Sequence, residues 1–290
     1  RPAPTPPPAL RPRRLTVSDA GLLIADPYAF YAKRVLRLDA LKALEEEVGA
    51  LDYGMLVHAA MAGFLRAIGT GWPGEDAARA AWDRASETAL DKYRDRPGVL
   101  AFWTPRLANI GGFVLEQEAA LRTVPLRACL VEVKGTAMLR LPGGDIEIEA
   151  RADRLDQLPN GGWRVGGYKT GSVPSAKALA AGSAPQLPIE AWLLEQGAFP
   201  GGGGRVTDLI YWRLTGGEQP GEPKAVGVAA EDGTPFAALA HDRLMALAEK
   251  WLLGDAPFAS RPHPGRAAMG GDYDHLARID EWSAGVAEGG

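Results

Sequence analysis

The stretch from residue 150 to residue 171, ARADRLDQLPNGGWRVGGYKTG, most constrains what this chain can fold into. Both halves read as short strands, and the Pro-Asn-Gly-Gly run at 159–162 between them is typical of a tight turn. Proline fixes φ, whereas Asn and Gly tolerate positive φ. The stretch therefore predicts a β-hairpin that brings Asp153 on one strand near Lys169 on the next.

An acid and a lysine on neighbouring strands are the beginnings of a metal-dependent phosphodiesterase site. Hydrolysis of a phosphodiester needs a water nucleophile and compensation for charge on the phosphoryl oxygens, and Mg²⁺ held by hard oxygen ligands supplies both. Asp153 fits the role of ligand, the carbonyl of Tyr168 is a second candidate ligand, and Lys169 can stabilise developing charge. The alternative is a surface salt bridge between Asp153 and Lys169. Gly167 stands where such a site wants a second carboxylate.

Composition bounds the class of protein. The chain has 290 residues, of which 46% are hydrophobic and 23% charged, as in an ordinary globular protein with a sizeable core. A net charge of -4 neither indicates nor excludes nucleic-acid binding, because a local basic groove matters more than the total. With Cys129 as its one cysteine, the chain excludes an intrachain disulfide framework, a cysteine-rich zinc site and a four-cysteine iron–sulfur cluster. We expect no membrane span and a cytoplasmic location.

The order of the elements predicts one domain. Residues 1–14 are rich in Pro and Arg and predict an extended linker, and residues 15–290 predict a single mixed α/β domain. Helical periodicity marks an early segment from residue 16 and a helix after residue 52, and then the ranges 75–93, 101–122, 175–198 and 234–253. Strand patterns mark the ranges 127–140, 146–158, 163–169, 206–214 and 224–228.

Four short motifs occur in a fixed order along the chain. They are GMLVH at 54–58 on a predicted helix, ARAD at 150–153 and GYKTG at 167–171 on the hairpin, and QLPIE at 186–190 on the following helix. This series resembles the RecB-type branch of the PD-(D/E)XK nuclease superfamily. The ends of the chain, DPYAFYA at 26–32 and YDHLAR at 273–278, resemble the C-terminal nuclease region of the AddB family of helicase–nuclease subunits, in its alphaproteobacterial form.

The resemblance implies a fold, a cofactor and roles for particular residues. The fold is a restriction-endonuclease-like mixed central β-sheet flanked by helices, and the cofactor is Mg²⁺ or Mn²⁺. His58 and Asp153 correspond to metal-binding residues, Lys169 to the catalytic lysine, and Gln186 to the glutamine that positions the active site or DNA. The implied activity is that of a DNA exonuclease within a helicase–nuclease that processes double-strand DNA ends for recombinational repair. The implied partners are single-stranded or unwound DNA and an AddA-like subunit.

Gly167 is the departure from the family pattern that matters most. Glycine has no side chain, so a bound Mg²⁺ loses a carboxylate. Three interpretations stay open: the site is degenerate, the residue is a mutation or sequence error, or another acid has taken over. Glu190 on the following helix is the main candidate for that acid, and Asp156 is a weaker one.

Contacts to DNA should be mostly to phosphates, since a processive nuclease reads no particular base. The candidates are Arg151, Arg154, Thr170, Lys177 and the pair Lys33-Arg34, although residues of these types are more often solvated surface groups. The alternative function is a catalytically inactive nuclease-like module that binds DNA or serves as a scaffold for a partner subunit. A third is an unrelated α/β protein in which Asp153 and Lys169 form a salt bridge.

Overall fold

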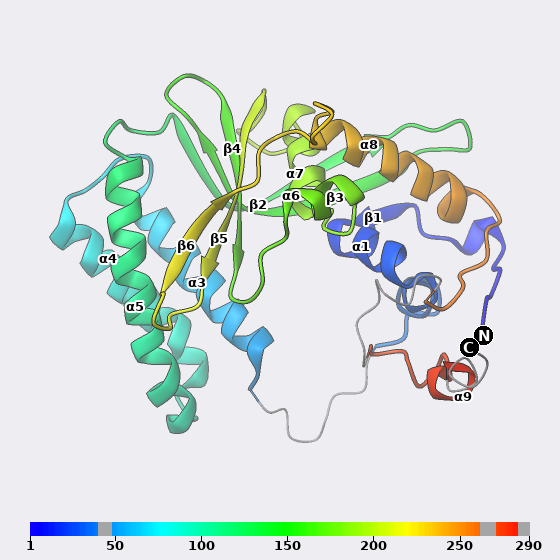
Figure 1. Ribbon diagram of the computed structural model, residues 1–290, viewed down its shortest axis with the longest axis horizontal. Coiled ribbons are helices and arrows are strands. Elements are labelled where there is room, and N and C mark those ends of the chain that lie inside the picture. The colour runs from blue at the N-terminus through cyan, green and yellow to red at the C-terminus, as the bar shows by residue number, and fades with distance from the viewer. Residues whose placement is uncertain (40–47, 262–270, 284–290) are drawn as a thin grey trace.

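A twisted six-stranded sheet forms the centre of the molecule (Figure 1). The computed structural model describes residues 1–39, 48–261 and 271–283. The strands are β1 (Arg14–Thr16), β2 (Ala128–Leu139), β3 (Ile146–Gln157), β4 (Trp163–Lys169), β5 (Val206–Leu214) and β6 (Gly221–Ala225). The α-helices are α1 (Val17–Ala25), α2 (Pro27–Phe30), α3 (Ala50–Ile68), α4 (Glu75–Leu90), α5 (Pro97–Leu121), α6 (Ala176–Ala181), α7 (Gln186–Glu195), α8 (Phe236–Leu247) and α9 (Ile279–Ser283). The 3₁₀ segments are η1 (Pro8–Leu10) and η3 (Asp91–Tyr93), and the π-helical segments are η2 (Tyr31–Val35) and η4 (Ala248–Leu253).

The sheet is mixed. Strands β2, β3 and β4 form the antiparallel meander that the sequence predicts, whereas β4 and β5 are parallel and are joined through α6 and α7. The turn between β3 and β4 closes as expected: the N–H of Leu158 donates to the carbonyl of Gly162, and Gly161 has a φ of 90°. The prediction of an α/β fold with a mixed sheet between helices is confirmed.

Strand β3 changes partners along one edge. It pairs with β2 from end to end, so β1 and β4 share its other edge. Parallel β1 pairs with residues 147–149, and antiparallel β4 pairs with residues 154–157. Asp153 lies between these two ladders. The sheet therefore opens beside Asp153, and the candidate site lies at this opening.

Two hydrophobic cores lie on the two faces of the sheet. One face packs against α1, α7 and α8, with Val165, Leu187 and Tyr211 at its centre. The other packs against α3, α4 and α5, with Tyr168 and Trp212 at its centre. Figure 1 shows these helices as two groups on either side of the strands. Because side chains alternate along β4, the side chains of Val165 and Lys169 point toward α7, and Gly167 lies on the same face of the strand. The side chain of Tyr168 points toward α3.

The first residues of the chain are held against the domain. The N–H groups of Phe258 and Ser260 donate to the carbonyls of Pro4 and Pro2, at 2.8 and 3.0 Å. Arg11 is buried and donates to the carbonyl of Trp251 at 2.9 Å. Apart from η1 and Arg14, which begins β1, residues 1–14 belong to no helix or strand, and several of them contact the C-terminal part of the domain. Their role as a linker stays a prediction.

The two end motifs at 26–32 and 273–278 lie side by side. Tyr28 packs with Ala277 and Ile279 in a small third core, and its hydroxyl donates to the carbonyl of Leu276 at 3.4 Å. The carboxylate of Asp26 caps α2 and accepts the N–H of Arg261. Segments that are almost 250 residues apart in the sequence therefore form one packed unit.

Candidate metal centre

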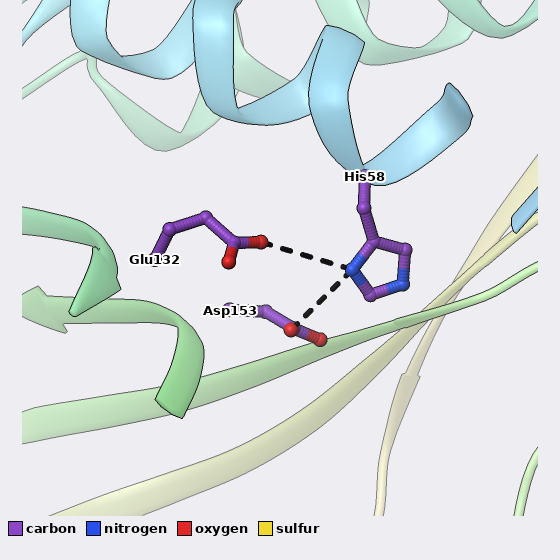
Figure 2. A group of neighbouring side chains, drawn as sticks. All are labelled: His58, Glu132 and Asp153. Carbon is purple, nitrogen blue, oxygen red and sulfur yellow. Dashed lines mark ion pairs between the residues drawn. The ribbon is translucent and has the colours of Figure 1, made fainter. Parts of the chain in front are cut away.

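Three side chains from three elements converge at the opening in the sheet (Figure 2). His58 comes from α3, Glu132 from β2 and Asp153 from β3. The Nδ1 atom of His58 lies 3.4 Å from Oδ1 of Asp153 and 3.9 Å from Oε1 of Glu132. One ligand atom from each residue lies within 4.8 Å of the other two, which is close enough for a single cation to contact all three.

Helix α3 carries His58 to the sheet, and Gly54 lies one turn earlier on the same face of the helix. A Cβ at Gly54 would lie 3.6 Å from Oγ1 of Thr170, an ordinary van der Waals distance, just beyond the end of β4. Residues four apart lie on the same face of a helix, so His58 also faces the end of β4. Its Nε2 atom lies 3.2 Å from the carbonyl oxygen of Tyr168. The GMLVH motif therefore places a glycine and, one turn later, a functional side chain beside the end of β4.

Glu132 interrupts the β2–β3 ladder directly opposite Asp153. The register pairs Val131 with Arg154 and Val133 with Ala152, which leaves Glu132 facing Asp153. Glu132 has a φ of 52°, which a residue with a side chain rarely adopts. Such backbone strain persists only where the surrounding structure holds it, and it occurs most often at functional sites.

Each carboxylate has one oxygen held by the protein and the other turned toward His58. Oδ2 of Asp153 accepts the backbone N–H of Tyr168 at 3.0 Å, and Oδ1 faces the imidazole. Oε2 of Glu132 pairs with Arg151 at 2.8 Å, and Oε1 faces the same imidazole nitrogen. The two free oxygens are therefore oriented before any ligand arrives.

The charge of this cluster changes the protonation of His58. Burial by itself lowers the pKa of His58, but hydrogen bonds and charge from Asp153 and Glu132 outweigh it and raise the pKa to about 9. With oxygens facing both ring nitrogens, the ring is an imidazolium at neutral pH in the metal-free chain. A positive charge is therefore favoured at the point where a cation would bind.

The donor set suits a hard divalent cation. Two carboxylate oxygens, an imidazole nitrogen and the nearby carbonyl of Tyr168 are ligands that Mg²⁺ and Mn²⁺ accept, and the nitrogen favours Mn²⁺ somewhat. Cys129, the one cysteine, is not part of the group. The prediction of His58, Asp153 and Tyr168 as ligands remains a proposal, which the geometry supports.

On the other face of the sheet, Lys169 faces α7. Its ammonium donates to Oε1 of Gln186 at 2.7 Å and lies 5.7 Å from the centre of the Tyr211 ring. One turn along α7, Glu190 is buried with its Oε2 atom unpartnered within the described part of the chain. Burial raises the pKa of Glu190 well above its usual range and the charge of Asp153 adds to this, whereas Gln186 and Lys169 oppose it. The carboxyl of Glu190 therefore lies near both Asp153 and Lys169.

Gly167 also faces α7, and the space beside it is occupied. A Cβ there would lie 3.2 Å from Cδ2 of Leu187 and 3.3 Å from Cε1 of Tyr211. These contacts are tighter than ordinary van der Waals contact. A carboxylate on β4 would need these neighbours to move. Glu190 on α7 is buried near the same Tyr211 ring.

Two cavities meet at Lys169 and Arg151. The cation cavity, about 870 Å³, lies on the α3 side and is lined by His58, Glu132 and Asp153. The α1 cavity, about 680 Å³, lies on the other side and is lined by Glu190 and by basic side chains of the α2–η2 region. Lys169 and Arg151 line both cavities. The candidate centre therefore lies in a groove that crosses the edge of the sheet.

The structure brings together most, but not all, of the residues that the sequence singled out. His58, Asp153, Tyr168, Lys169, Gln186 and Glu190 lie around the groove, and Arg151 and Thr170 line it. Lys177 is exposed at the start of α6 and lines neither cavity. Its contact with DNA stays a prediction.

The predicted DNA contact of Arg154 is corrected. Its side chain is 1% exposed, and its guanidinium binds Glu118 on α5 at 3.1 Å and Asp156 at 2.8 Å. An arginine whose donors are taken up by two buried carboxylates does not reach a phosphate. Asp156 is engaged in the same pairing, which also removes it as the replacement acid.

Sequence reasoning missed Glu132, because the turn alone does not fix its partner. Folding the two strands symmetrically about the Pro-Gly-Gly-Asp turn at 142–145 would pair residue 132 with residue 155. The observed register pairs Leu139 with Ile146, and this places Glu132 opposite Asp153. An acid between two valines on a core strand, opposite a candidate ligand, was the pattern to look for.

Comparison with known proteins gives a family and few further details. A family model of the PD-(D/E)XK nuclease superfamily matches residues 14–267. Curated relatives include uncharacterized proteins of Rickettsia bellii, 27% identical over 193 residues, and Rickettsia conorii, 28% identical over 196 residues. Each alignment covers 65% of this chain but only 22% and 23% of the relative, so the chain spans less than a quarter of these proteins.

One solved structure, the crystal structure of SSO0001, covers 70% of this chain and 79% of its own, with 18% identity and a TM-score of 0.28. A TM-score this low does not bear on the fold. Within the described residues, no helix is long and apolar enough to cross a bilayer. The family model covers most of the chain and includes every side chain of the candidate centre, so the chain belongs to the PD-(D/E)XK nuclease superfamily.

Proposed function

We propose that this chain is a metal-dependent DNA phosphodiesterase. The observation that carries the proposal is the cluster of His58, Glu132 and Asp153, in which each carboxylate turns one free oxygen toward a common point. Lys169 lines the same cavity. A surface salt bridge between Asp153 and Lys169 is not favoured, because the ammonium is bound to Gln186 and the carboxylate to the backbone of Tyr168.

Different residues of the chain have different roles in the reaction. His58, Glu132 and Asp153 would hold the divalent cation, beside the carbonyl of Tyr168. The cation would neutralise charge on the phosphoryl oxygens and acidify the attacking water. Gln186 holds the ammonium of Lys169 in place, so that its positive charge is oriented before the transition state develops negative charge.

We assign the role of the missing second acid to Glu190. Its carboxyl is buried beside Lys169 and coupled to Asp153, and one of its oxygens has no hydrogen-bond partner in the described part of the chain. Replacing Gly167 with Asp is then expected to leave cleavage unimproved and to lower the free energy of unfolding by about 1–3 kcal/mol, because Leu187 and Tyr211 are crowded. Faster cleavage by Gly167→Asp would instead favour a degenerate site.

The activity is tested with end-labelled single-stranded DNA in Mg²⁺ and in Mn²⁺. We expect cleavage that EDTA stops, that Asp153→Asn abolishes, and that Lys169→Met slows by about 100-fold or more while cation binding, measured by calorimetry, is retained. Lys224→Met is the matched control, since Lys224 is exposed on β6 and lines neither cavity. Cleavage that survives Asp153→Asn would refute the assignment of the site.

The wider role we propose is that of an exonuclease domain in an AddB-like subunit of a helicase–nuclease that processes double-strand ends with an AddA-like partner. Two observations support it: the end motifs pack together as one unit, and the curated relatives are more than four times longer than the part that matches this chain. An exonuclease should degrade linear single-stranded DNA and spare a closed single-stranded circle. Equal degradation of both would contradict the exonuclease assignment.

A binding or scaffolding module without catalysis is the second candidate, and Gly167 favours it, since β4 lacks the usual acid. In that case the chain binds DNA with the affinity of the Asp153→Asn variant and does not cleave it in either cation. The cleavage assay described above decides between the two.

A further inference from the structure

A third hollow continues the groove beyond the cation cavity. This aromatic cavity, about 700 Å³, lies between the start of α3, α5 and the end of β5, and Tyr53, Phe102 and Arg106 line it. It shares Ala50, Thr170 and Gly171 with the cation cavity. The two hollows are therefore adjacent, with the end of β4 between them.

Phe102 and Arg106 form an open stacking platform on α5. They are four residues apart and so lie on one face of the helix. The Phe102 side chain is 58% exposed, and the guanidinium of Arg106 lies 4.4 Å from the centre of its ring. No carboxylate pairs with Arg106 in the parts of the chain that the structure describes. An exposed aromatic ring beside an arginine that no carboxylate neutralises offers an apolar planar surface and a positive charge at the same place.

The platform is fixed rigidly to the sheet. Tyr53 packs on Trp103 and donates its hydroxyl to the carbonyl of Thr215 at 3.0 Å, and Asn109 donates to the carbonyl of Gly216 at 3.1 Å. The loop after β5 approaches so closely that a Cβ at Gly216 would lie 2.4 Å from the carbonyl oxygen of Arg106. The distance between the platform and the cation centre is therefore set by the fold.

The walls of the groove differ in chemistry along its length. Leu51, Met55 and Phe102 are exposed apolar side chains that line the cation cavity and the aromatic cavity. Basic side chains, Lys33 and Arg34 among them, line the α1 cavity. A single nucleic-acid strand has the matching asymmetry, since unstacked bases seek apolar and aromatic surfaces and phosphates seek basic ones.

We propose that the Phe102–Arg106 platform is a base-stacking subsite, which holds an unpaired base of single-stranded DNA while a nearby phosphodiester of the same strand lies at the cation centre. The subsite rests on the proposed function, because it assumes a DNA strand in the groove. The subsite requires a single-stranded substrate, since a base within a duplex has no free face to stack on the platform.

The test measures the affinity of the full chain for a fluorescein-labelled 20-nucleotide oligothymidylate, by anisotropy in EDTA so that no cleavage occurs. We expect Phe102→Ala to weaken binding by about 5- to 100-fold and Phe102→Trp to restore it. The same variants should differ little for an abasic strand of equal length, which has phosphates but no bases. Val124→Ala, which changes an apolar side chain that is also 58% exposed and lies outside the groove, is the control for surface effects.

A second measurement does not depend on a variant. A strand that carries 5-iodouracil should photocrosslink to the tryptic peptide of residues 95–106 in the unaltered chain. If the unaltered chain cleaves DNA but Phe102→Ala binds equally well and this peptide is not labelled, the subsite is wrong while the proposed function stands. If Phe102→Ala weakens binding but no cation supports cleavage, the subsite stands and catalysis fails. No binding by the unaltered chain overturns both.

Discussion

At the scale of single residues, the centre combines groups that would repel each other in isolation. Glu132 and Asp153 each turn an oxygen to the same point, Glu190 lies buried beside them, and Lys169 and protonated His58 supply the opposing charge. Such an arrangement stores electrostatic strain that a divalent cation relieves. Two residue-level predictions follow from the protonation of His58 and Glu190.

Glu190→Gln separates the role of the charge from the role of the shape. Burial raises the pKa of Glu190 well above its usual range and so favours the protonated acid, and Gln has nearly the same shape as that acid. We therefore expect the free energy of unfolding in EDTA to change by less than about 1 kcal/mol at pH 7, while cleavage falls about 100-fold or more. Chemical denaturation and single-turnover cleavage measure the two effects.

Glu195→Gln provides the control on the same helix, because Glu195 is exposed and faces the N–H of Val206. Its cleavage rate should stay close to that of the unaltered chain. If Glu190→Gln cleaves at the original rate, the acid has not moved to α7, and the centre works with Asp153 and Glu132 alone.

His58 gives the metal-free chain a defined pH dependence. In the unfolded chain its pKa is near 6.5, and in the folded chain the two carboxylates raise the pKa to about 9. Below pH 6.5 His58 is protonated in both the folded and the unfolded state, and its interaction with the two carboxylates stabilises the folded state fully. Above pH 9 His58 is neutral in both states, and this stabilisation is lost. The extra stability is at most about 3 kcal/mol, because each pKa unit is worth about 1.4 kcal/mol and the side chain is partly exposed.

We expect the stability difference between the unaltered chain and His58→Gln, measured by denaturation in EDTA, to be largest near pH 6 and to shrink through pH 9. A difference that grows with pH would mean that the carboxylates do not hold a proton on His58. Saturating Mn²⁺ should remove the trend, since the cation then replaces the proton as the partner of the carboxylates.

At the scale of elements, helix packing depends on a single glycine in α5. A Cβ at Gly111 would lie 2.2 Å from Nε1 of Trp82 on α4, whereas nothing lies within 4 Å of a Cβ at the next residue, Gly112. The structure assigns the two glycines different roles: Gly111 lets α4 approach, and Gly112 faces open space.

The matched pair Gly111→Ala and Gly112→Ala tests this packing. Alanine favours a helix over glycine by about 1 kcal/mol, so Gly112→Ala should be neutral or stabilising by up to that amount. Gly111→Ala meets the Trp82 ring and should destabilise by about 1–3 kcal/mol, because overpacking outweighs the gain in propensity. Thermal denaturation of both variants measures the difference, and equal effects would mean that α4 and α5 are not packed as described.

Several elements follow from local sequence, and the exceptions have physical causes. The bounds of β4 and β5 match the predicted ranges 163–169 and 206–214, because both strands are apolar and bounded by turns. β6 begins at Gly221 rather than at residue 224, since its residues are mostly exposed and its register comes from pairing with β5. The predicted helix at 175–198 is two helices, α6 and α7, because the chain turns at Gly182, which has a φ of 77°, and α7 begins only after Pro185.

The candidate centre was predictable wherever it rests on local motifs. His58, Asp153, Lys169 and Gln186 stand in short patterns and lie together as expected. The position of Glu132 depends on the register of the β2–β3 hairpin and on a positive φ, and the neighbouring residues in the sequence indicate neither of them. The burial of Arg154 depends on Glu118, which is 36 residues away on α5.

At the scale of the whole molecule, the net charge does not reveal that positive side chains line the groove. The chain carries a net charge of -4, yet six cationic side chains line the three cavities: Lys33, Arg34, Arg66, Arg106, Arg151 and Lys169. Two of them are already paired, Arg34 with Asp19 and Arg151 with Glu132. A strand in the groove should therefore meet about four free positive charges within a negatively charged protein.

This charge distribution predicts a shallow dependence of DNA binding on salt. For a single strand, the slope of log affinity against log salt is about -0.7 per phosphate contacted, so about four contacts give a slope near -3. Lys33→Ala should reduce the magnitude of the slope by about 0.7, whereas Lys224→Ala, on β6 outside the groove, should leave it unchanged. Anisotropy titrations with an oligothymidylate in EDTA, between 50 and 300 mM salt, give the slopes. Equal slopes for both variants would mean that the phosphates follow another surface, and a slope near zero would mean that the bases on the apolar wall carry nearly all of the affinity.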